Sequence, residues 1–449
     1  MFLPHTDKER QQMLETIGVK TIEELFAAIP QKYRFPELKL PSALTEMEAQ
    51  AVISDLASTN DNLQEMICFL GAGAYNHYIP AVVDAIIRRG EFLTAYTPYQ
   101  AEVSQGTLQS IFDFQSLMTA LTGMEVSNAS HYDGATAVAE AVTMANAHFR
   151  GKRNRVILSP ALHPHYRQTV RTYHANTGIE FVGDEPSADL RASPESLAEL
   201  LNENTALVIV QYPDFFGRIY DYTQLAAKAH QAGALFAVSV NPIALGLLKP
   251  PSEFGADIVT GEGQPLGIPL SFGGPYLGIF TTRKEYVRRM AGRLVGETVD
   301  NRGQKAYVLT LTAREQHIRR EKATSNICTN QGLMALAATV YLSLVGKHGL
   351  RQVAELCYHK AHYAADQIKA IEGFSLWSDE PFFNEFVVKS PTPPQELNQK
   401  LLEYGIIGGY DLEQDYPSLK GYVMFAVTEM NTKEEIDYLV STLAEVSHA

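Results

Sequence analysis

Apolar residues in the middle of the chain form short continuous runs that alternate with amphipathic segments. The pattern predicts, in chain order, strands at 156–159, 179–182, 206–210 and 235–240, with helices between them at 164–173, 194–202 and 223–231. Continuous apolar strands that alternate with helices are typical of a mainly parallel sheet covered on both faces. We therefore expect an α/β domain whose ligands lie beyond the carboxyl ends of its strands.

The first sixty residues lack this alternation. Two helices are predicted there, at 7–17 and 21–28, followed by a connector that contains Pro30, Pro36 and Pro41. Because proline fixes φ and interrupts helices, the connector is expected to be extended. An N-terminal arm of this kind can pack on a partner subunit or cover its own domain, and the pattern leaves both open.

The pattern changes again after an apolar helix predicted at 333–345. The elements beyond it are typical of a small α+β domain: helices at 350–371, 394–404 and 433–446, and strands at 385–389 and 423–428. The chain is therefore predicted to have three parts: an N-terminal helical arm at 1–60, a large α/β domain at 61–345 and a small C-terminal α+β domain at 346–449.

Composition narrows the class of protein. A chain of 449 residues is too long for one compact core, and a formal charge of −14 argues against nucleic-acid and anionic-membrane partners. The N-terminus lacks the apolar run of a signal peptide, and the run at 333–345 is too short to span a bilayer. Cys68, Cys328 and Cys357 form no C-x-x-C pair, which suits a reducing compartment. A cytoplasmic location is expected.

A glycine-rich loop joins two short predicted strands between Asp257 and Phe280. Ordering such a flexible loop costs roughly 1–2 kcal/mol per residue in backbone entropy, so it needs a reason to exist. Glycines let the backbone approach a ligand closely, which makes a binding role the natural one. No lysine occurs between Lys249 and Lys284.

Polar residues gather in a loop before the helix predicted at 107–122. A surface loop would explain them, but so many donors and acceptors favour a binding loop. The residues concerned are Tyr96, Tyr99, Gln100, Glu102 and Gln105.

Small residues precede the helix predicted at 137–149. Free N–H groups and the positive end of the helix dipole could bind an anion there. Alternatively, Asp133 or Thr136 simply caps the helix, with Gly134 between them.

Two further segments have both a plain and a functional interpretation. The charged segment 283–320 is expected to be a loop before the helix predicted at 333–345. Its arginines and lysines would ordinarily form a solvated face, but they could also bind an anion or meet a partner. His163 and His165 have only His174 as a nearby additional ligand, so no metal site is expected. We interpret His163 as a structural residue or as a ring that packs in the cleft.

The large α/β domain, the small C-terminal domain and the N-terminal arm together resemble a fold-type I pyridoxal-phosphate enzyme. Three longer motifs are similar to glycine decarboxylase, the P-protein of the glycine cleavage system: YTPYQAEVSQG at 96–106, NASHYDGATAVAEA at 128–141 and REQHIRREKATSNICTNQ at 314–331. The resemblance covers essentially the whole chain. Its length is similar to that of the bacterial two-subunit form, and the chain resembles the N-terminal half, subunit 1 (alpha).

The chain departs from that family's pattern at two positions. Ser239 stands where an aspartate would pair with the pyridine nitrogen of the cofactor, and Gln264 stands where the Schiff-base lysine would be. The resemblance therefore implies a degenerate cofactor pocket in this chain, formed by Asp133, Gly134, Thr136, His163, Ser239 and Gln264. Pyridoxal phosphate would be bound covalently by the homologous partner, subunit 2 (beta).

The activity implied is that of glycine dehydrogenase (aminomethyl-transferring), an oxidoreductase of glycine catabolism that is active only as a complex of both subunits. Glycine is decarboxylated, and the aminomethyl group passes to the lipoyl arm of the H-protein, in a system that also includes T- and L-proteins. This chain would complete the partner's site across the interface. The candidate residues are Tyr96, Tyr99, Gln100, Glu102, Gln105, His317, Arg319, Lys322, Thr324 and Asn326.

Two other functions remain open. The chain could be a self-sufficient pyridoxal-phosphate aminotransferase or decarboxylase that uses another lysine, such as Lys249 or Lys322. It could also be a non-catalytic scaffold that stabilises its paralogue or docks the H-protein. Heterodimers and dimers of heterodimers fit the sequence equally well.

Overall fold

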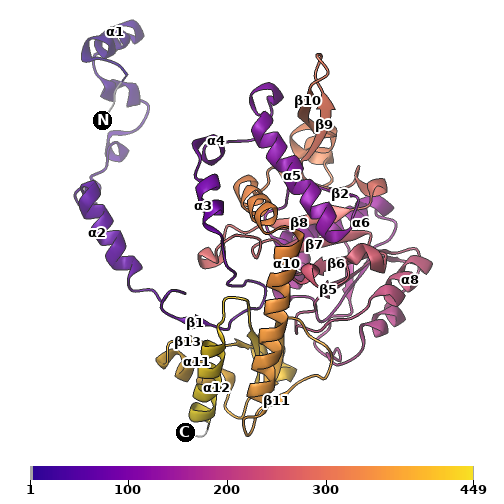
Figure 1. Ribbon diagram of the computed structural model, residues 1–449. Helices are drawn as coiled ribbons and strands as arrows, with labels where there is room; N and C mark the ends of the chain where they lie inside the picture. The colour runs from indigo at the N-terminus through magenta and orange to yellow at the C-terminus, as the bar shows by residue number, and fades with distance from the viewer. Residues whose placement is uncertain (1–3, 448–449) are drawn as a thin grey trace. The chain divides into compact units, whose positions relative to one another are not determined.

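The computed structural model describes residues 4–447, and the chain separates into two compact units at Asp61–Asn62 (Figure 1). The N-terminal unit holds α1 (Asp7–Ile17) and α2 (Glu46–Ala57), with 3₁₀ turns at Ile22–Phe26 and Gln31–Tyr33 between them. The helix predicted at 21–28 is thus a shorter 3₁₀ turn. Within residues 4–61, no helix or turn contains a buried residue. Because helices in proteins are stabilised mainly by packing, nothing in this unit stabilises a longer α-helix at 21–28.

A seven-stranded sheet dominates the second unit, in the order β2-β8-β7-β6-β5-β3-β4. Its strands are β2 (Val126–Ser127), β3 (Arg155–Leu158), β4 (Glu180–Val182), β5 (Thr205–Tyr212), β6 (Leu235–Val240), β7 (Ile258–Glu262) and β8 (Gly278–Thr282). Strands β3 to β7 are parallel, whereas β8 runs antiparallel to both β7 and β2. The predicted, mainly parallel sheet is confirmed.

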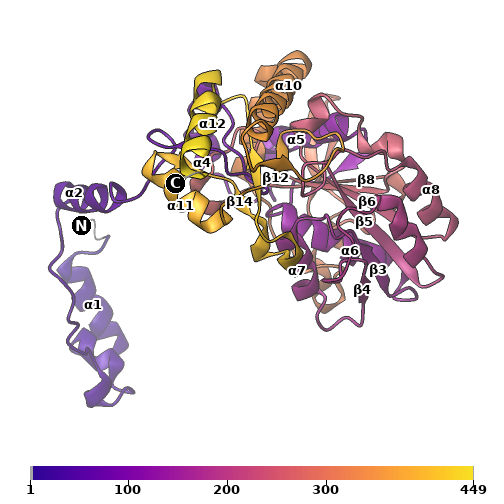
Figure 2. The same cartoon turned by 90° about the horizontal axis from the view of Figure 1, so that it is seen from below.

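Helices cover both faces of this sheet. Alternate residues of β5 point to opposite sides: Leu207 and Ile209 pack with α6 (Gly134–Phe149) and α7 (Pro164–Tyr173), while Val208 packs with α8 (Thr223–Gln231). Figure 2 shows α8 and the α6–α7 pair on either side of the strands. The segment predicted as a helix at 194–202 is a 3₁₀ helix at Pro194–Leu200.

Three further helices precede β2, namely α3 (Ala81–Ile87), α4 (Gly90–Leu93) and α5 (Gln105–Thr122). A hairpin of β9 (Leu294–Val299) and β10 (Lys305–Thr310) projects near α5 (Figure 1). A short helix α9 (Gln316–Arg319) follows. The charged segment 283–320 was expected to be a loop, and the hairpin corrects that expectation. Its pairing depends on a side chain distant in sequence, because Gln105 hydrogen-bonds both the N–H and the carbonyl of Tyr307.

One long helix, α10 (Gly332–Lys369), connects the large sheet with the C-terminal part (Figure 1). It contains both helices predicted at 333–345 and 350–371, which meet at a kink at Gly346. Among the described residues it is the one helix long and apolar enough to cross a membrane by length and composition. Its apolar side chains, such as Leu336 and Ile368, are buried in two cores, which is the behaviour of a core helix.

The C-terminal part contains a small antiparallel sheet in the order β11-β12-β15-β14. These strands are β11 (Ser375–Leu376), β12 (Glu385–Lys389), β15 (Tyr422–Ala426) and β14 (Tyr410–Asp411), and helices α11 (Pro394–Glu403) and α12 (Lys433–Ser447) pack on them. In addition, β1 (Ile67–Cys68) pairs in parallel with β13 (Ile406–Ile407). The expected small α+β part is therefore present.

Candidate functional site

The glycine-rich loop and the start of α6 meet at the carboxyl end of β7. Glu262, the last residue of β7, accepts hydrogen bonds from the backbone N–H groups of Gly134 (2.9 Å), Gln264 (3.0 Å) and Leu277 (3.0 Å). Gly134 is the first residue of α6. A helix N-terminus attracts anions, and here the anion is the chain's own carboxylate. Burial raises the pKa of Glu262 to about 7, although its three N–H donors oppose this shift.

The start of α6 is also capped from within the helix. Asp133 accepts a hydrogen bond from the N–H of Thr136 at 2.7 Å, and the Thr136 hydroxyl accepts one from the N–H of Asp133 at 3.2 Å. This reciprocal pair is a capping box. Of the two interpretations of this segment, the cap is thus formed, and the anion position is taken by Glu262.

Gln264 ties the glycine-rich loop to the segment around Tyr75. Its amide nitrogen donates to the carbonyls of Tyr75 (2.9 Å) and Ile268 (2.8 Å), and its oxygen accepts from the N–H of Tyr75 (2.9 Å). The side chain is 1% exposed, and both of its amide groups are satisfied. It therefore acts as a structural clasp at the position that the sequence analysis assigned to the Schiff-base lysine of the family pattern.

The clasp continues into the C-terminal sheet. The hydroxyl of Tyr75 donates to Glu385 Oε2 at 2.9 Å, and the N–H of Ala72 donates to Glu385 Oε1 at 2.7 Å. Glu385 lies on β12, and burial raises its pKa to about 7. Together, Gln264, Tyr75 and Glu385 join the loop after β7 to the small sheet.

His163 is buried and packed between aromatic rings. Its Nδ1 accepts from the N–H of His165 (3.1 Å), so Nε2 carries the proton and donates to the carbonyl of Ala72 (2.8 Å). The imidazole stacks on Tyr166 with ring centroids 4.5 Å apart, and burial lowers the pKa of His163 to about 4. His163 is therefore a neutral, fully bonded ring.

The space left for a cofactor is very small. A cavity of about 30 Å³, lined by residues that include His163, Tyr166, Ser239 and Glu262, lies at the carboxyl ends of the strands. That volume holds roughly one or two water molecules. No lysine lines it among the described residues, Ser239 brings no charge for a ring nitrogen, and Glu262 occupies the helix N-terminus. The residues of this pocket do not fit pyridoxal phosphate.

A second cluster forms where the loop at 96–105 meets the segment after β10. Its centre is Arg293, which is 3% exposed. The guanidinium donates to the hydroxyl of Tyr99 and to the side-chain oxygen of Asn330, both at 3.3 Å. Glu315 Oε2 lies 3.8 Å from Arg293 Nε and 3.5 Å from His317 Nδ1. The structure thus places the two predicted binding segments around one buried arginine.

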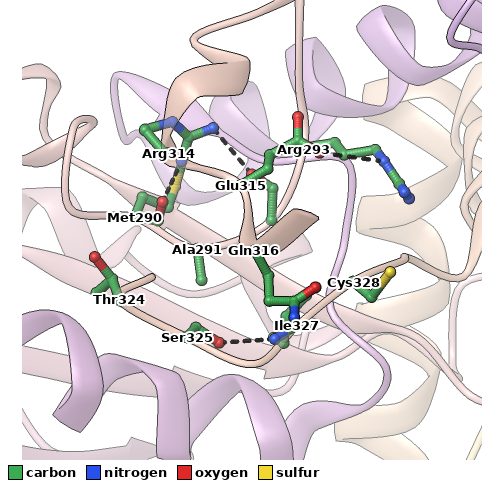
Figure 3. Close-up of a pocket in the computed structure, with 11 residues that line it drawn as sticks. Met290, Ala291, Arg293, Arg314, Glu315, Gln316, Thr324, Ser325, Ile327 and Cys328 are labelled. Carbon is green, nitrogen blue, oxygen red and sulfur yellow. Dashed lines mark hydrogen bonds and ion pairs between the residues drawn. The ribbon is translucent and has the colours of Figure 1, made fainter. Parts of the chain in front are cut away.

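Two cavities border this cluster. One, of about 280 Å³, lies beneath Tyr96–Pro98 and includes Arg293 and Asn330 in its wall. The other holds only about 20 Å³ and is lined by Arg293, Arg314 and Glu315 among others. Figure 3 shows the smaller one, with the guanidinium of Arg293 directed away from Arg314. Arg314 bonds the carbonyls of Met290, Gly292 and Leu311, so its role is structural.

The other predicted candidates lie in different environments. Gln105 is engaged with Ala101 and Tyr307, and so anchors the hairpin. Thr324 is half-buried and lines the smaller cavity. The exposed candidates are Tyr96, Tyr99, Gln100, Glu102, His317, Arg319, Lys322 and Asn326. Glu262, Glu385 and Arg293 were missed by the sequence reasoning, because nothing in their spacing marks them and only the fold buries them.

One group of three potential metal ligands occurs among the described residues, and it does not include His163 or His165. It consists of His77, Cys357 and Glu429. His77 Nδ1 lies 2.7 Å from Glu429 Oε2, and the thiol of Cys357 donates to the same oxygen at 3.4 Å. This contact places His77, Tyr78 and Cys357 around one carboxylate, because the N–H of Tyr78 donates to Glu429 Oε1.

Comparison with known families decides where the chain belongs. The family model described as glycine cleavage system P-protein matches residues 1–443. The chain belongs to the glycine cleavage system P-protein family.

Relatives in the P-protein family match the chain end to end. A protein of Thermomicrobium roseum named "Probable glycine dehydrogenase (decarboxylating) subunit 1" is 56% identical over 447 residues, covering 100% of both chains. A crystal structure of glycine decarboxylase (P-protein) of the glycine cleavage system, in inhibitor-bound form, superposes with a TM-score of 0.91. It shares 41% identity and covers 99% of this chain and 100% of its own.

The fold extends to more distant proteins. Glutamate decarboxylase of Lactobacillus brevis superposes with a TM-score of 0.70 at 13% identity, covering 94% of this P-protein-family chain and 97% of its own. Such a likeness shows the fold alone, which is that of fold-type I pyridoxal-phosphate enzymes. The predicted fold class and the resemblance to the P-protein are both confirmed.

Proposed function

We propose that this chain is the cofactor-free subunit of a two-subunit glycine decarboxylase, and that a homologous, lysine-bearing subunit carries pyridoxal phosphate. The pair would decarboxylate glycine and pass the aminomethyl group to the lipoyl arm of the H-protein, alongside T- and L-proteins. Carbon dioxide leaves, one lipoyl sulfur takes the aminomethyl carbon, and the other becomes a thiol, so the disulfide is reduced. The relatives' designation as subunit 1 supports a second subunit.

The closed pocket carries the cofactor-free part of this proposal. Glu262 accepts a hydrogen bond from the first N–H of α6, Gln264 is fully hydrogen-bonded, and the remaining cavity is about 30 Å³. A Schiff base needs an amine, and a pyridinium ring needs an anion beside its nitrogen. Among the described residues no amine lines this pocket, and its one carboxylate, Glu262, is already bonded to three backbone N–H groups, so the chemistry belongs to another chain.

This chain's contribution would come from the Arg293 cluster and the exposed loops beside it. Tyr96, Tyr99 and His317 are exposed, while Arg293 behind them is buried. A rigid buried anchor with exposed polar groups in front of it can orient a substrate bound by a neighbouring subunit. Covering these groups with the partner would also keep water from the reacting carbon.

The lysines that a self-sufficient enzyme would need lie elsewhere. Lys249 Nζ is 3.8 Å from Asp221 and 4.9 Å from the ring centre of Phe254, and it does not line the pocket. Lys322 is exposed in the segment after β10. Neither position supports the aminotransferase alternative.

The decisive experiment is the absorbance spectrum after pyridoxal phosphate is added and the excess removed. This chain alone is expected to show no Schiff-base band, and the band should appear when the partner subunit is present. A stable, borohydride-reducible band from this chain alone would overturn the proposal.

Substitution of exposed candidates separates an active-site contribution from a scaffold. Tyr96→Phe and His317→Gln are expected to leave association with the partner unchanged and to lower kcat/KM by at least about tenfold, or about 1.4 kcal/mol. Gln109→Ala, on the exposed face of α5, serves as the control. Normal turnover in both variants would favour the scaffold.

A further inference from the structure

Arg293 is a buried cation whose hydrogen bonds are incomplete. Its Nε has no hydrogen-bond partner among residues 4–447, and its two other nitrogens make bonds of 3.3 Å. Charge-assisted hydrogen bonds of arginine are ordinarily near 2.7–2.9 Å. A guanidinium that is 3% exposed should be paired, so this one has unused donor capacity.

Glu315 does not use that capacity. Its Oε2 lies 3.8 Å from Arg293 Nε, which is an ion-pair distance but too long for a hydrogen bond. The same oxygen is 3.5 Å from His317, and Glu315 Oε1 has no hydrogen-bond partner within the described chain. The two arginines, Arg293 and Arg314, and the carboxylate of Glu315 together carry one net positive charge, which suits a ligand with a single negative charge.

The larger cavity provides space beside the arginine. It measures about 280 Å³ and lies between the loop Tyr96–Pro98, α5 and the start of α10. Its wall has a polar part, with Arg293, Thr329 and Asn330, and an apolar part, with Ile111, Leu333 and Leu336. A wall of this kind suits a small ligand that has one charged end and a short apolar or small body.

We propose that this cavity is a carboxylate-binding site, in which Arg293 and Asn330 hold the carboxylate of a small monocarboxylic acid. The planar guanidinium matches a carboxylate in two parallel hydrogen bonds, and Arg293 has donors to spare. Glycine belongs to this ligand class, and to that extent the inference rests on the proposed function. Arg293 would then be a substrate-orienting residue that this chain supplies.

The test measures binding without turnover, by isothermal titration calorimetry on the assembled two-subunit complex. Acetate and propionate are the ligands, because they carry the carboxylate but have no amine to react with a cofactor aldehyde. Acetamide, which is close to acetate in size but has neither the negative charge nor a reactive amine, is the control ligand. Wild type is expected to bind acetate, and Arg293→Gln to bind it at least tenfold more weakly.

Matched variants separate binding from folding. Arg351→Gln, which changes an exposed arginine of α10, is expected to bind acetate as wild type does. Arg293→Lys keeps the charge but loses the fork, so an intermediate affinity is expected; circular dichroism verifies that each variant is folded. Equal acetate binding by wild type and Arg293→Gln, absence of acetate binding by wild type, or acetamide binding equal to that of acetate would each overturn the inference.

The experiment distinguishes failure of this site from failure of the proposed function. Acetate binding that depends on Arg293 in a complex that does not turn over glycine would reject the proposed function and retain this site. Normal glycine turnover with no such binding would reject the site alone.

Discussion

Glu262 is the last residue of a strand, and its carboxylate is also the anion at a helix N-terminus, a position that a bound ligand often takes. It ends a buried strand, and its carboxylate satisfies N–H groups at the start of α6 and on both sides of the glycine-rich loop. Burial disfavours the charged form, whereas the three donors favour it. The net result, a pKa raised to about 7, makes this residue a source of pH-dependent stability.

We predict that Glu262→Gln flattens the pH dependence of stability. Because the folded pKa lies above the usual 4.5, the folded protein holds a proton that the unfolded chain releases between these values. The contribution of Glu262 to the free energy of unfolding is therefore full below pH 4.5 and falls by up to about 3 kcal/mol as the pH rises through 7. Urea unfolding across this range measures it.

The control for that series is Glu321→Gln, which changes an exposed carboxylate. It should reproduce the wild-type slope. Glu140 and Glu385, whose pKa values burial also raises to about 7, remain in both proteins and cancel in the comparison. If Glu262→Gln and wild type lost stability in parallel, the carboxylate would not be the titrating group.

Individual residues show where sequence reasoning was strong and where it failed. Ser239 and Gln264 could be singled out because the resemblance assigned the aspartate and the lysine of the family pattern to those positions. Glu262 lies two residues before Gln264 and was overlooked, since a glutamate at the end of a strand is unremarkable until the fold removes water from it. Arg293 was hidden in a charged segment for the same reason.

At the scale of elements, the kink in α10 is the clearest case of a residue that sets a shape. Gly346 has φ 58° and ψ −173°, a combination that is essentially restricted to glycine. Its position lets the two halves of α10 pack into separate cores.

Gly346→Ala is therefore expected to lower the free energy of unfolding by about 1–3 kcal/mol through backbone strain alone. No neighbouring atom lies within 4 Å of a Cβ built there, so a steric clash does not contribute. Gly106→Ala is the control, because Gly106 lies in α5 and also has no atom within 4 Å of a Cβ built there. This variant should be as stable as wild type or slightly more stable. Chemical denaturation of both variants makes the comparison, and equal stabilities would contradict it.

The strands and helices between β3 and β7 were predictable because each depends mainly on its own apolar pattern. The β9–β10 hairpin was not, because its strands carry charges and its register is held by Gln105 from a distant helix. The 3₁₀ turn at Ile22–Phe26 was mistaken for an α-helix because the sequence does not show burial, and the turn contains no buried residue.

At the scale of the whole molecule, the N-terminal unit exposes apolar side chains in the way that a subunit interface does. Its apolar side chains are largely exposed, with Leu40 at 73% and Met47 at 77%. Apolar side chains so open to water gain free energy when they are covered. We expect the homologous partner subunit to cover them, which is one of the two interpretations that the sequence left open for this arm.

Leu40→Ser combined with Met47→Ser should weaken association with the partner subunit by at least about tenfold, which corresponds to about 1.4 kcal/mol. Lys39→Ser, beside Leu40, is the matched control and should associate normally. Analytical ultracentrifugation of the mixed subunits measures the effect. Unchanged association together with a less stable isolated chain would show that the arm covers its own domain instead.

The pocket filled by Gln264 and Glu262 has a consequence for the way this protein responds to a change in cofactor supply. A subunit that binds a cofactor gains stability from it, about 4 kcal/mol when the free cofactor is a thousandfold above its Kd, and loses that gain when supply falls. Here the pocket is filled by side chains of the chain itself, so this part of its stability does not depend on the concentration of any ligand. If the partner subunit carries pyridoxal phosphate as proposed, the partner becomes the less stable half of the pair in a cell short of vitamin B6, while this chain keeps its full stability.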